Sequence, residues 1–182
     1  VDKVTGRAKF GADLAMQGQL VGRMLRSPHP HARIKKIDIS AALKLEGVKA
    51  IVTSADFKDQ PSEFIPAGEM MINYKDVVRN VMARDKVLYE GHPVAAVAAT
   101  SASVAKQALK LIKVDYDVLP FVLDVEAAMK PDAPLIQDDL ITSGLTPIPT
   151  KPSNIAKYVN FELGDIAKGF KEADVVIERT FK

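Results

Sequence analysis

The chain has 182 residues, of which 47% are apolar and 26% are charged, and its formal net charge is +2 at pH 7. This composition is typical of a globular protein with one sizeable core, and it excludes the strong basic field that nucleic-acid binding requires. The sequence has no cysteine, which excludes disulfides, thiolate nucleophiles and cysteine-bound zinc or iron–sulfur clusters within this chain. We therefore expect a cytoplasmic protein. The longest clean apolar run, residues 94–99, is too short to span a membrane.

The first part of the sequence predicts strands that are separated by turns rich in glycine and proline. A short helix is predicted over residues 40–47, with Ser40 as its N-cap and Gly47 at its end. Residues 57–80 contain two prolines and a glycine among residues of mixed polarity, which predicts a long loop with one short element. The strand candidates are residues 19–27, 33–40 and 48–56.

The middle of the sequence carries the clearest periodicity. After a strand over 86–91, the continuous apolar run "VAAVAAT" predicts a strand that is buried on both faces. Residues 101–112 predict a helix with lysines on one face and with Val104, Ala108, Leu111 and Ile112 on the other. Residues 113–120 alternate as a half-buried strand does, with Val114, Tyr116 and Val118 on the inner face.

The last third of the sequence is less regular and contains more prolines. A short helix is predicted over 124–129, and a second one over 164–174 is followed by a strand over 175–181. Five of the eleven prolines lie between them, which predicts irregular structure. We expect an α+β fold with a mixed β-sheet and a few short helices, organised as a core (1–130), a proline-rich extended segment (131–160) and a helix-and-strand tail (161–182).

The stretch "RSPHPHARIKKIDIS" holds two of the three histidines, His29 and His31. Residues two apart on a strand point to one face, so both side chains could reach one metal ion. A catalytic metal normally has a third protein ligand, and no motif connects His92 to this pair. The prolines on either side of His29 favour a stiff extended connection. We therefore expect these histidines to have a structural role.

Three other patterns are weaker candidates for chemistry. Asp115 and Asp117 resemble a carboxylate pair, but they occupy the polar half of an alternating strand, so a solvated sheet face explains them. His92 lies in a Gly-His-Pro turn and has no sequence partner for acid–base work. Gly6 and Gly11 have the spacing of a phosphate loop but lack its Lys-Ser/Thr ending. No catalytic, cofactor-binding or metal-binding residue is predicted in this chain.

Five stretches, in order, resemble one family. They are "KVTGRAKFGADL", the long stretch from "LVGRMLRSPHPHARI" to "GVKAIVT", "ARDKVLYEGHPVAAVAA", "ALKLIKVDYDVLP" and "GDIAKGFKEADVVIERTF". Together they resemble the N-terminal a/b hammerhead domain of the molybdopterin-binding large subunit of the xanthine dehydrogenase and aldehyde oxidase family. Within this family, the five stretches most resemble the large subunits of 4-hydroxybenzoyl-CoA reductase and carbon monoxide dehydrogenase.

The resemblance implies a structural domain of a molybdenum-containing oxidoreductase that hydroxylates or reduces an aromatic or aldehyde-like substrate. It implies molybdopterin in the remainder of the large subunit, with iron–sulfur clusters and FAD on partner subunits or domains. The chain alone is expected to be inactive, because the family's cofactor-binding motifs lie beyond residue 182. Residues 57–80 and 145–155 are its expected contact surfaces. The alternatives are a free-standing module that binds a small ligand or a protein, and a metal-dependent hydrolase built on His29 and His31.

Overall fold

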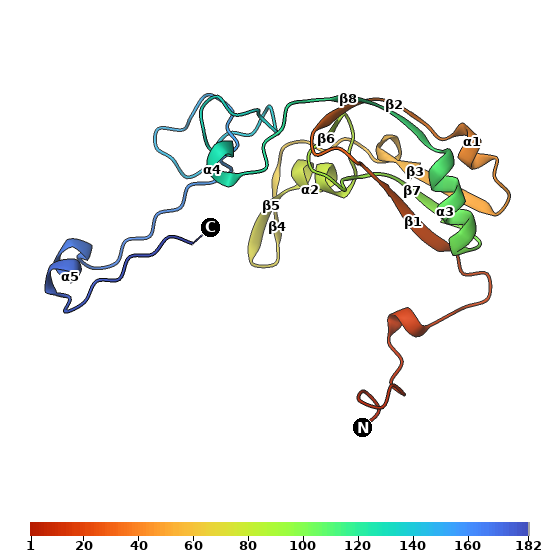
Figure 1. Ribbon diagram of the computed structural model, residues 1–182, viewed down its shortest axis with the longest axis horizontal. Coiled ribbons are helices and arrows are strands. Elements are labelled where there is room, and N and C mark those ends of the chain that lie inside the picture. Colours follow the sequence, from red (N-terminus) through yellow and green to blue (C-terminus); the bar gives the residue numbers. More distant parts are fainter. Residues whose placement is uncertain (182) are drawn as a thin grey trace. The chain divides into compact units, whose positions relative to one another are not determined.

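Figure 1 shows the computed structural model, which describes residues 1–181 except for the side chain of residue 12. The chain forms two compact units, Val1–Asp124 and a second that begins at Val125. The boundaries predicted after residues 130 and 160 remain predictions. The strands, all in the first unit, are β1 (Val21–Arg26), β2 (Ala32–Asp38), β3 (Val48–Thr53), β4 (Phe64–Ala67), β5 (Met70–Asn73), β6 (Lys86–Val87), β7 (Pro93–Ala99) and β8 (Lys113–Val118).

Helices are short and lie mostly between these strands. The first unit contains α1 (Ser40–Leu43), α2 (Tyr74–Val81) and α3 (Ala102–Leu111), together with single 3-10 turns at Gly11–Asp13 and Ser54–Asp56. The second unit contains α4 (Val125–Ala128) and α5 (Ile166–Glu172). Within the described residues, no helix is long and apolar enough to cross a membrane.

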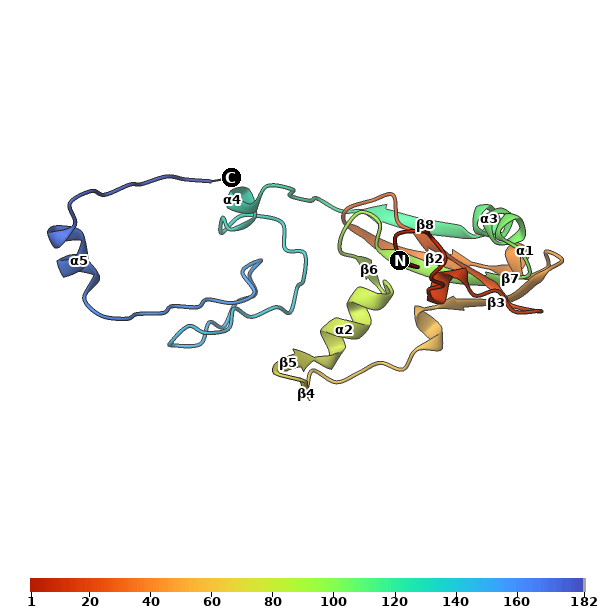
Figure 2. The ribbon, with the colours of Figure 1, turned by 90° about the horizontal axis from the view of Figure 1, so that it is seen from below.

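The first sheet has the order β1-β7-β3, and helices α1 and α3 pack on one side of it (Figure 2). Strand β7 is central because it pairs with both β1 and β3, and its small side chains let the helices approach closely. The core between this sheet and the helices is apolar throughout, and its buried members are Ala42, Ile51, Ala95, Val97, Ala99, Ala105, Ala108 and Ile112. The expected burial of β7 on both faces is complete on one face; on the other, Val94 is buried but Ala96 and Ala98 are only half-buried.

A second sheet has the order β6-β2-β8, and a smaller core forms around Ala32, Ala83, Val87 and Val94. The predicted α+β class is confirmed, but every strand pair in the sheets is antiparallel, so the expected mixed sheet is not formed. The reason is that β8, which follows β7 and α3 in the chain, pairs with β2 instead of returning beside β7.

Residues 57–80 are more regular than a loop. Strands β4 and β5 form a hairpin that turns at Gly68, whose φ of +67° suits glycine, and α2 follows directly. The side chain of Asn73 caps α2 by accepting a hydrogen bond from the N–H of Lys75 at 3.1 Å. The signal for this helix is the 3.6-residue spacing of the apolar residues Tyr74, Val77, Val78 and Val81. It was missed because the preceding prolines indicate a loop.

Other predicted elements differ at their ends. Helix α1 has Ile39, and not Ser40, at its N-cap position, and no side chain caps the helix. Ser40 is the first helical residue, and its N–H and hydroxyl both donate to the carboxylate of Asp38. The strand predicted over 86–91 is two residues long, because its remainder turns into the Gly91 bend. Two apolar residues expected to face inward, Leu111 and Val118, are exposed.

The strand predicted over 175–181 is also wrong. These residues are in neither a strand nor a helix, because no described segment pairs with them. The predicted helix before them is confirmed as α5, and the proline-rich segment is irregular as expected.

Candidate functional site

The histidines lie in two turns that are joined by backbone hydrogen bonds. The N–H of Ser27 donates to the carbonyl of His92 at 2.9 Å, and the N–H of Gly91 donates to the carbonyl of Ser27 at 2.9 Å. Arg26 adds a third link, because its Nη1 donates to the Gly91 carbonyl at 2.8 Å. The turn after β1 and the turn before β7 therefore form one unit, which we call the histidine turns (residues 26–31 and 88–93).

His92 is fully buried and uses both ring nitrogens. Its Nδ1 accepts from the N–H of Leu88 at 3.2 Å, which leaves Nε2 as the protonated nitrogen that donates to the carbonyl of Arg79 at 2.8 Å. Burial lowers the pKa of His92 below its usual range, and the bond to the Arg79 carbonyl opposes this effect less strongly. The neutral ring is thus held in one tautomer.

Tyr89 stacks on this ring, with centroids 4.4 Å apart, and its hydroxyl donates to the carbonyl of Asn80 at 3.2 Å. The carbonyls of Arg79 and Asn80 belong to the last turn of α2, where a helix has no backbone donors left. Tyr89 and His92 therefore cap the C-terminus of α2 from the turn before β7. Sequence reasoning missed this role, although the Tyr-x-x-His spacing within a turn was visible.

His31 and His29 have separate surroundings. His31 is buried, and its Nδ1 donates to the carbonyl of Pro120 at 2.6 Å. This hydrogen bond holds the segment that follows β8 against the turn before β2. Its Nε2 is buried without a hydrogen-bond partner among the described residues. His29 packs edge-on against Tyr116 at 5.0 Å between ring centroids. Burial raises the pKa of Tyr116, opposed by a hydrogen bond with the Ser27 side chain.

The histidines that were weighed as a metal site do not form a three-ligand group among the described residues. Both ring nitrogens of His92 are occupied, so it cannot serve as the third ligand that a site at His29 and His31 requires. The described residues contain no group of three or more His, Asp or Glu side chains that could hold a metal ion. The hydrolase alternative therefore has no geometric support.

The remaining candidates are surface features. Asp115 and Asp117 are exposed on β8, as the strand alternation predicts, and Asp117 lies 3.9 Å from Lys35 in a solvent-exposed ion pair. Around Gly6 and Gly11 the chain is exposed, and an added Cβ at either glycine would meet no atom within 4 Å. No backbone cradle for a phosphate is formed by the described residues at these glycines.

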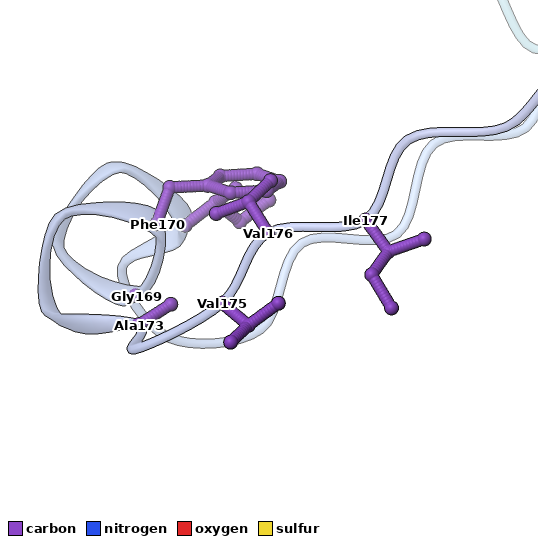
Figure 3. Close-up of a pocket in the computed structure, with 7 residues that line it drawn as sticks. Gly169, Phe170, Ala173, Val175, Val176 and Ile177 are labelled. Atoms are coloured by element: carbon purple, nitrogen blue, oxygen red, sulfur yellow. The ribbon is translucent and has the colours of Figure 1, made fainter.

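A hollow of about 360 Å³ lies in the second unit beside α5, where Figure 3 shows the side chains of Phe170, Val175 and Val176 around it. The other lining residues are also apolar or glycine: Ile166, Gly169, Ala173 and Ile177. A pterin needs several hydrogen-bond donors and acceptors in fixed positions, and these side chains offer none. The hollow does not suit such a cofactor.

Comparison with known proteins identifies the domain. Residues 5–120 match the family model described as "Aldehyde oxidase and xanthine dehydrogenase, a/b hammerhead domain". The chain belongs to this family. The hammerhead identity agrees with the α+β class and with the resemblance carried by the sequence, and it covers most of the first unit.

Several relatives place the hammerhead domain among much longer proteins. It is 41% identical over 137 residues to the carbon monoxide dehydrogenase large chain of Afipia carboxidovorans, covering 74% of this chain and 16% of that protein. It is 35% identical to a probable xanthine dehydrogenase subunit of Bacillus subtilis, covering 99% of this chain and 21% of that protein. The solved aldehyde oxidoreductase of Desulfovibrio gigas matches with a TM-score of 0.64 and 32% identity, over 76% of this chain and 16% of that one. The chain thus spans about a fifth of the length of these relatives.

Proposed function

We propose that this chain is the structural hammerhead domain of a molybdenum-containing oxidoreductase of the xanthine dehydrogenase and aldehyde oxidase type. The observation that carries the proposal is the family match over residues 5–120, in relatives about five times longer. A shorter relative, from Eubacterium barkeri, is named as the large molybdopterin subunit of a nicotinate dehydrogenase, with 32% identity over all of this chain and 37% of that protein.

The parent enzyme, under this proposal, hydroxylates or reduces an aromatic or aldehyde-like substrate in the cytoplasm. Its molybdopterin is held outside these residues, and partner subunits or domains carry iron–sulfur clusters and FAD. Under this proposal the residues of this chain take part in no reaction step, because the histidine turns position backbone segments and the hollow beside α5 does not fit a pterin. The domain alone is therefore proposed to be inactive.

Exposed apolar side chains support a role in packing against larger partners. On the β4–β5 hairpin, Phe64, Met70 and Met71 are between 59% and 67% exposed. In the second unit, Phe161 and Leu163 are at least 90% exposed. Large exposed apolar side chains in groups mark contact surfaces. We propose that both segments are covered in the assembled enzyme.

The test is to isolate the longest natural polypeptide that carries this sequence and to measure its molybdenum and pterin content. Stoichiometric cofactor in that polypeptide, with none bound by the 182-residue chain, is the expected result. A polypeptide that ends at residue 182 and purifies with no molybdopterin-binding partner would overturn the proposal and favour a free-standing binding module.

A further inference from the structure

The first sheet has a second face that no helix covers among the described residues. Along β7 the side chains alternate, so that Ala95, Val97 and Ala99 face α1 and α3 while Val94, Ala96 and Ala98 point the other way. The smaller core buries Val94, and the face is open only around Ala96 and Ala98. Cross-strand pairing places Gly22 and Met24 of β1, and Ala50 and Val52 of β3, beside these two alanines. We call these six residues the open sheet face: Gly22, Met24, Ala50, Val52, Ala96 and Ala98.

This face is apolar and partly accessible. None of its six residues is polar, Met24 is 40% exposed, Gly22 and Ala50 are exposed, and the others are half-buried. Antiparallel sheets that face water on one side normally carry polar residues there. The continuous apolar run in β7 is instead typical of a strand buried on both faces. The sequence therefore predicts a cover that the described residues do not provide.

Gly22 is an independent sign of a close neighbour. A glycine inside a strand weakens it by about 0.5–1 kcal/mol relative to alanine, so its presence needs a reason. Its φ is not positive, and an added Cβ would meet no atom within 4 Å. Neither backbone conformation nor packing within the described residues requires glycine at this position. Close approach of a backbone from outside the described residues explains it.

We infer that the open sheet face is the surface on which the molybdopterin-binding remainder of the same enzyme packs, through an apolar surface of its own. This inference rests on the proposed function. The length of the relatives indicates which polypeptide occupies the face. About four-fifths of the length of the relatives lies outside the aligned region, so a large body of polypeptide is available to cover the face. Small residues on the face allow that body to approach the sheet backbone closely.

Methionine oxidation by hydrogen peroxide tests this inference without altering the fold. We expect Met24 to be oxidised at least about ten-fold more slowly in the intact natural polypeptide than in the 182-residue chain. In the intact polypeptide, Ala98→Glu should restore Met24 oxidation to within about two-fold of the free rate. The matched control Ala102→Glu places the same charge at an exposed position at the start of α3 and should leave Met24 protected. Circular dichroism of both variants of the 182-residue chain checks that the fold is retained.

Equal oxidation of Met24 in the two proteins would overturn the inference. Met24 protection that grows with the concentration of the 182-residue chain would overturn it in favour of a second copy as the occupant. A cofactor-loaded polypeptide with an accessible Met24 leaves the proposed function standing and removes only this inference. A polypeptide without molybdopterin or a molybdopterin-binding partner removes both.

Discussion

The two units of this chain are stabilised by different forces. The first contains two clusters of buried apolar side chains, and its largest fully buried residues are His92, Val87, Val94 and Val97. Among the described residues of the second unit, Thr142 alone is buried. Its hydroxyl donates to the carbonyl of Ile155 at 2.7 Å.

Asn154 explains how the second unit is ordered without an apolar core. Its Nδ2 donates to the carbonyls of Ala128 and Pro134 at 3.1 and 3.0 Å, and its Oδ1 accepts from the N–H of Ile136 at 3.0 Å. Prolines remove backbone donors, and side-chain amides and hydroxyls satisfy the carbonyls left over. Burial of apolar side chains therefore stabilises the first unit, whereas specific hydrogen bonds shape the second.

The largest effect is expected from an unpaired charge in the first unit. Val97→Asp puts a carboxylate among apolar residues with no partner, which costs more than about 4 kcal/mol and should unfold this unit. Loss of the cooperative urea transition would show it. Val175→Asp, at an exposed position of the second unit, is the matched control and should leave that transition unchanged. A folded Val97→Asp protein would contradict the conclusion that apolar burial stabilises the first unit.

The next effect concerns His92. His92→Phe keeps an aromatic ring against Tyr89 but leaves the carbonyl of Arg79 and the N–H of Leu88 without their partner. We expect a loss of about 2–4 kcal/mol in the free energy of unfolding, measured in urea. Tyr89→Phe removes one bond at a partly exposed site and should cost about 1 kcal/mol. A smaller loss for His92→Phe than for Tyr89→Phe would show that His92 is not the main link to α2.

Asn154→Ala should loosen the second unit alone. Removing three hydrogen bonds costs about 1–3 kcal/mol locally. Amide hydrogen exchange should therefore accelerate over residues 128–155 and remain unchanged in β7. The comparison variant is Asn160→Ala, which removes an exposed bond to Glu162 and should have no such effect. Faster exchange in β7 of Asn154→Ala would show that the two units unfold together.

A pH dependence follows from His92. The pKa of His92 is lower in the folded than in the unfolded state. At a pH between these two pKa values, the unfolded state therefore binds more protons than the folded state. The stability contribution is complete above the unfolded pKa of about 6.5 and is lost as the pH falls through the folded value. Urea transitions between about pH 7 and pH 5 should show this decline, and it should be smaller in His92→Phe. An identical decline in the variant would assign the effect to other groups.

The smallest effect is expected at the surface of the second sheet. Lys35→Ala removes an ion pair with Asp117 in which both side chains are more than half exposed, so the change should stay below about 0.5 kcal/mol. Urea unfolding should show this small difference at low salt, and a smaller one at high salt, because salt screens exposed charges. A loss above about 1 kcal/mol would mean that β8 depends on this pair.

Local sequence patterns predicted the elements that carry a clear apolar periodicity, even where their strand partners lie far away in the sequence. The central strand, the helix over Ala102–Leu111 and the following strand were all identified, because a single periodicity governs each of them. The hairpin and α2 were missed, since their prolines resemble loop residues while the apolar stripe of α2 spans only eight residues. The final strand was wrong because a strand requires a partner, which periodicity cannot supply.

The fold class, the family and, apart from the exposed Leu111, the core face of α3 could be identified without the structure. These follow from spacing and from ordered motifs along the chain. Tertiary structure alone decided the role of the histidines: His92 meets a carbonyl thirteen residues away, and His31 meets one eighty-nine residues away. Such contacts depend on how the strands are ordered in the sheets. The same ordering left one apolar face of the first sheet open, which the sequence had indicated would be covered.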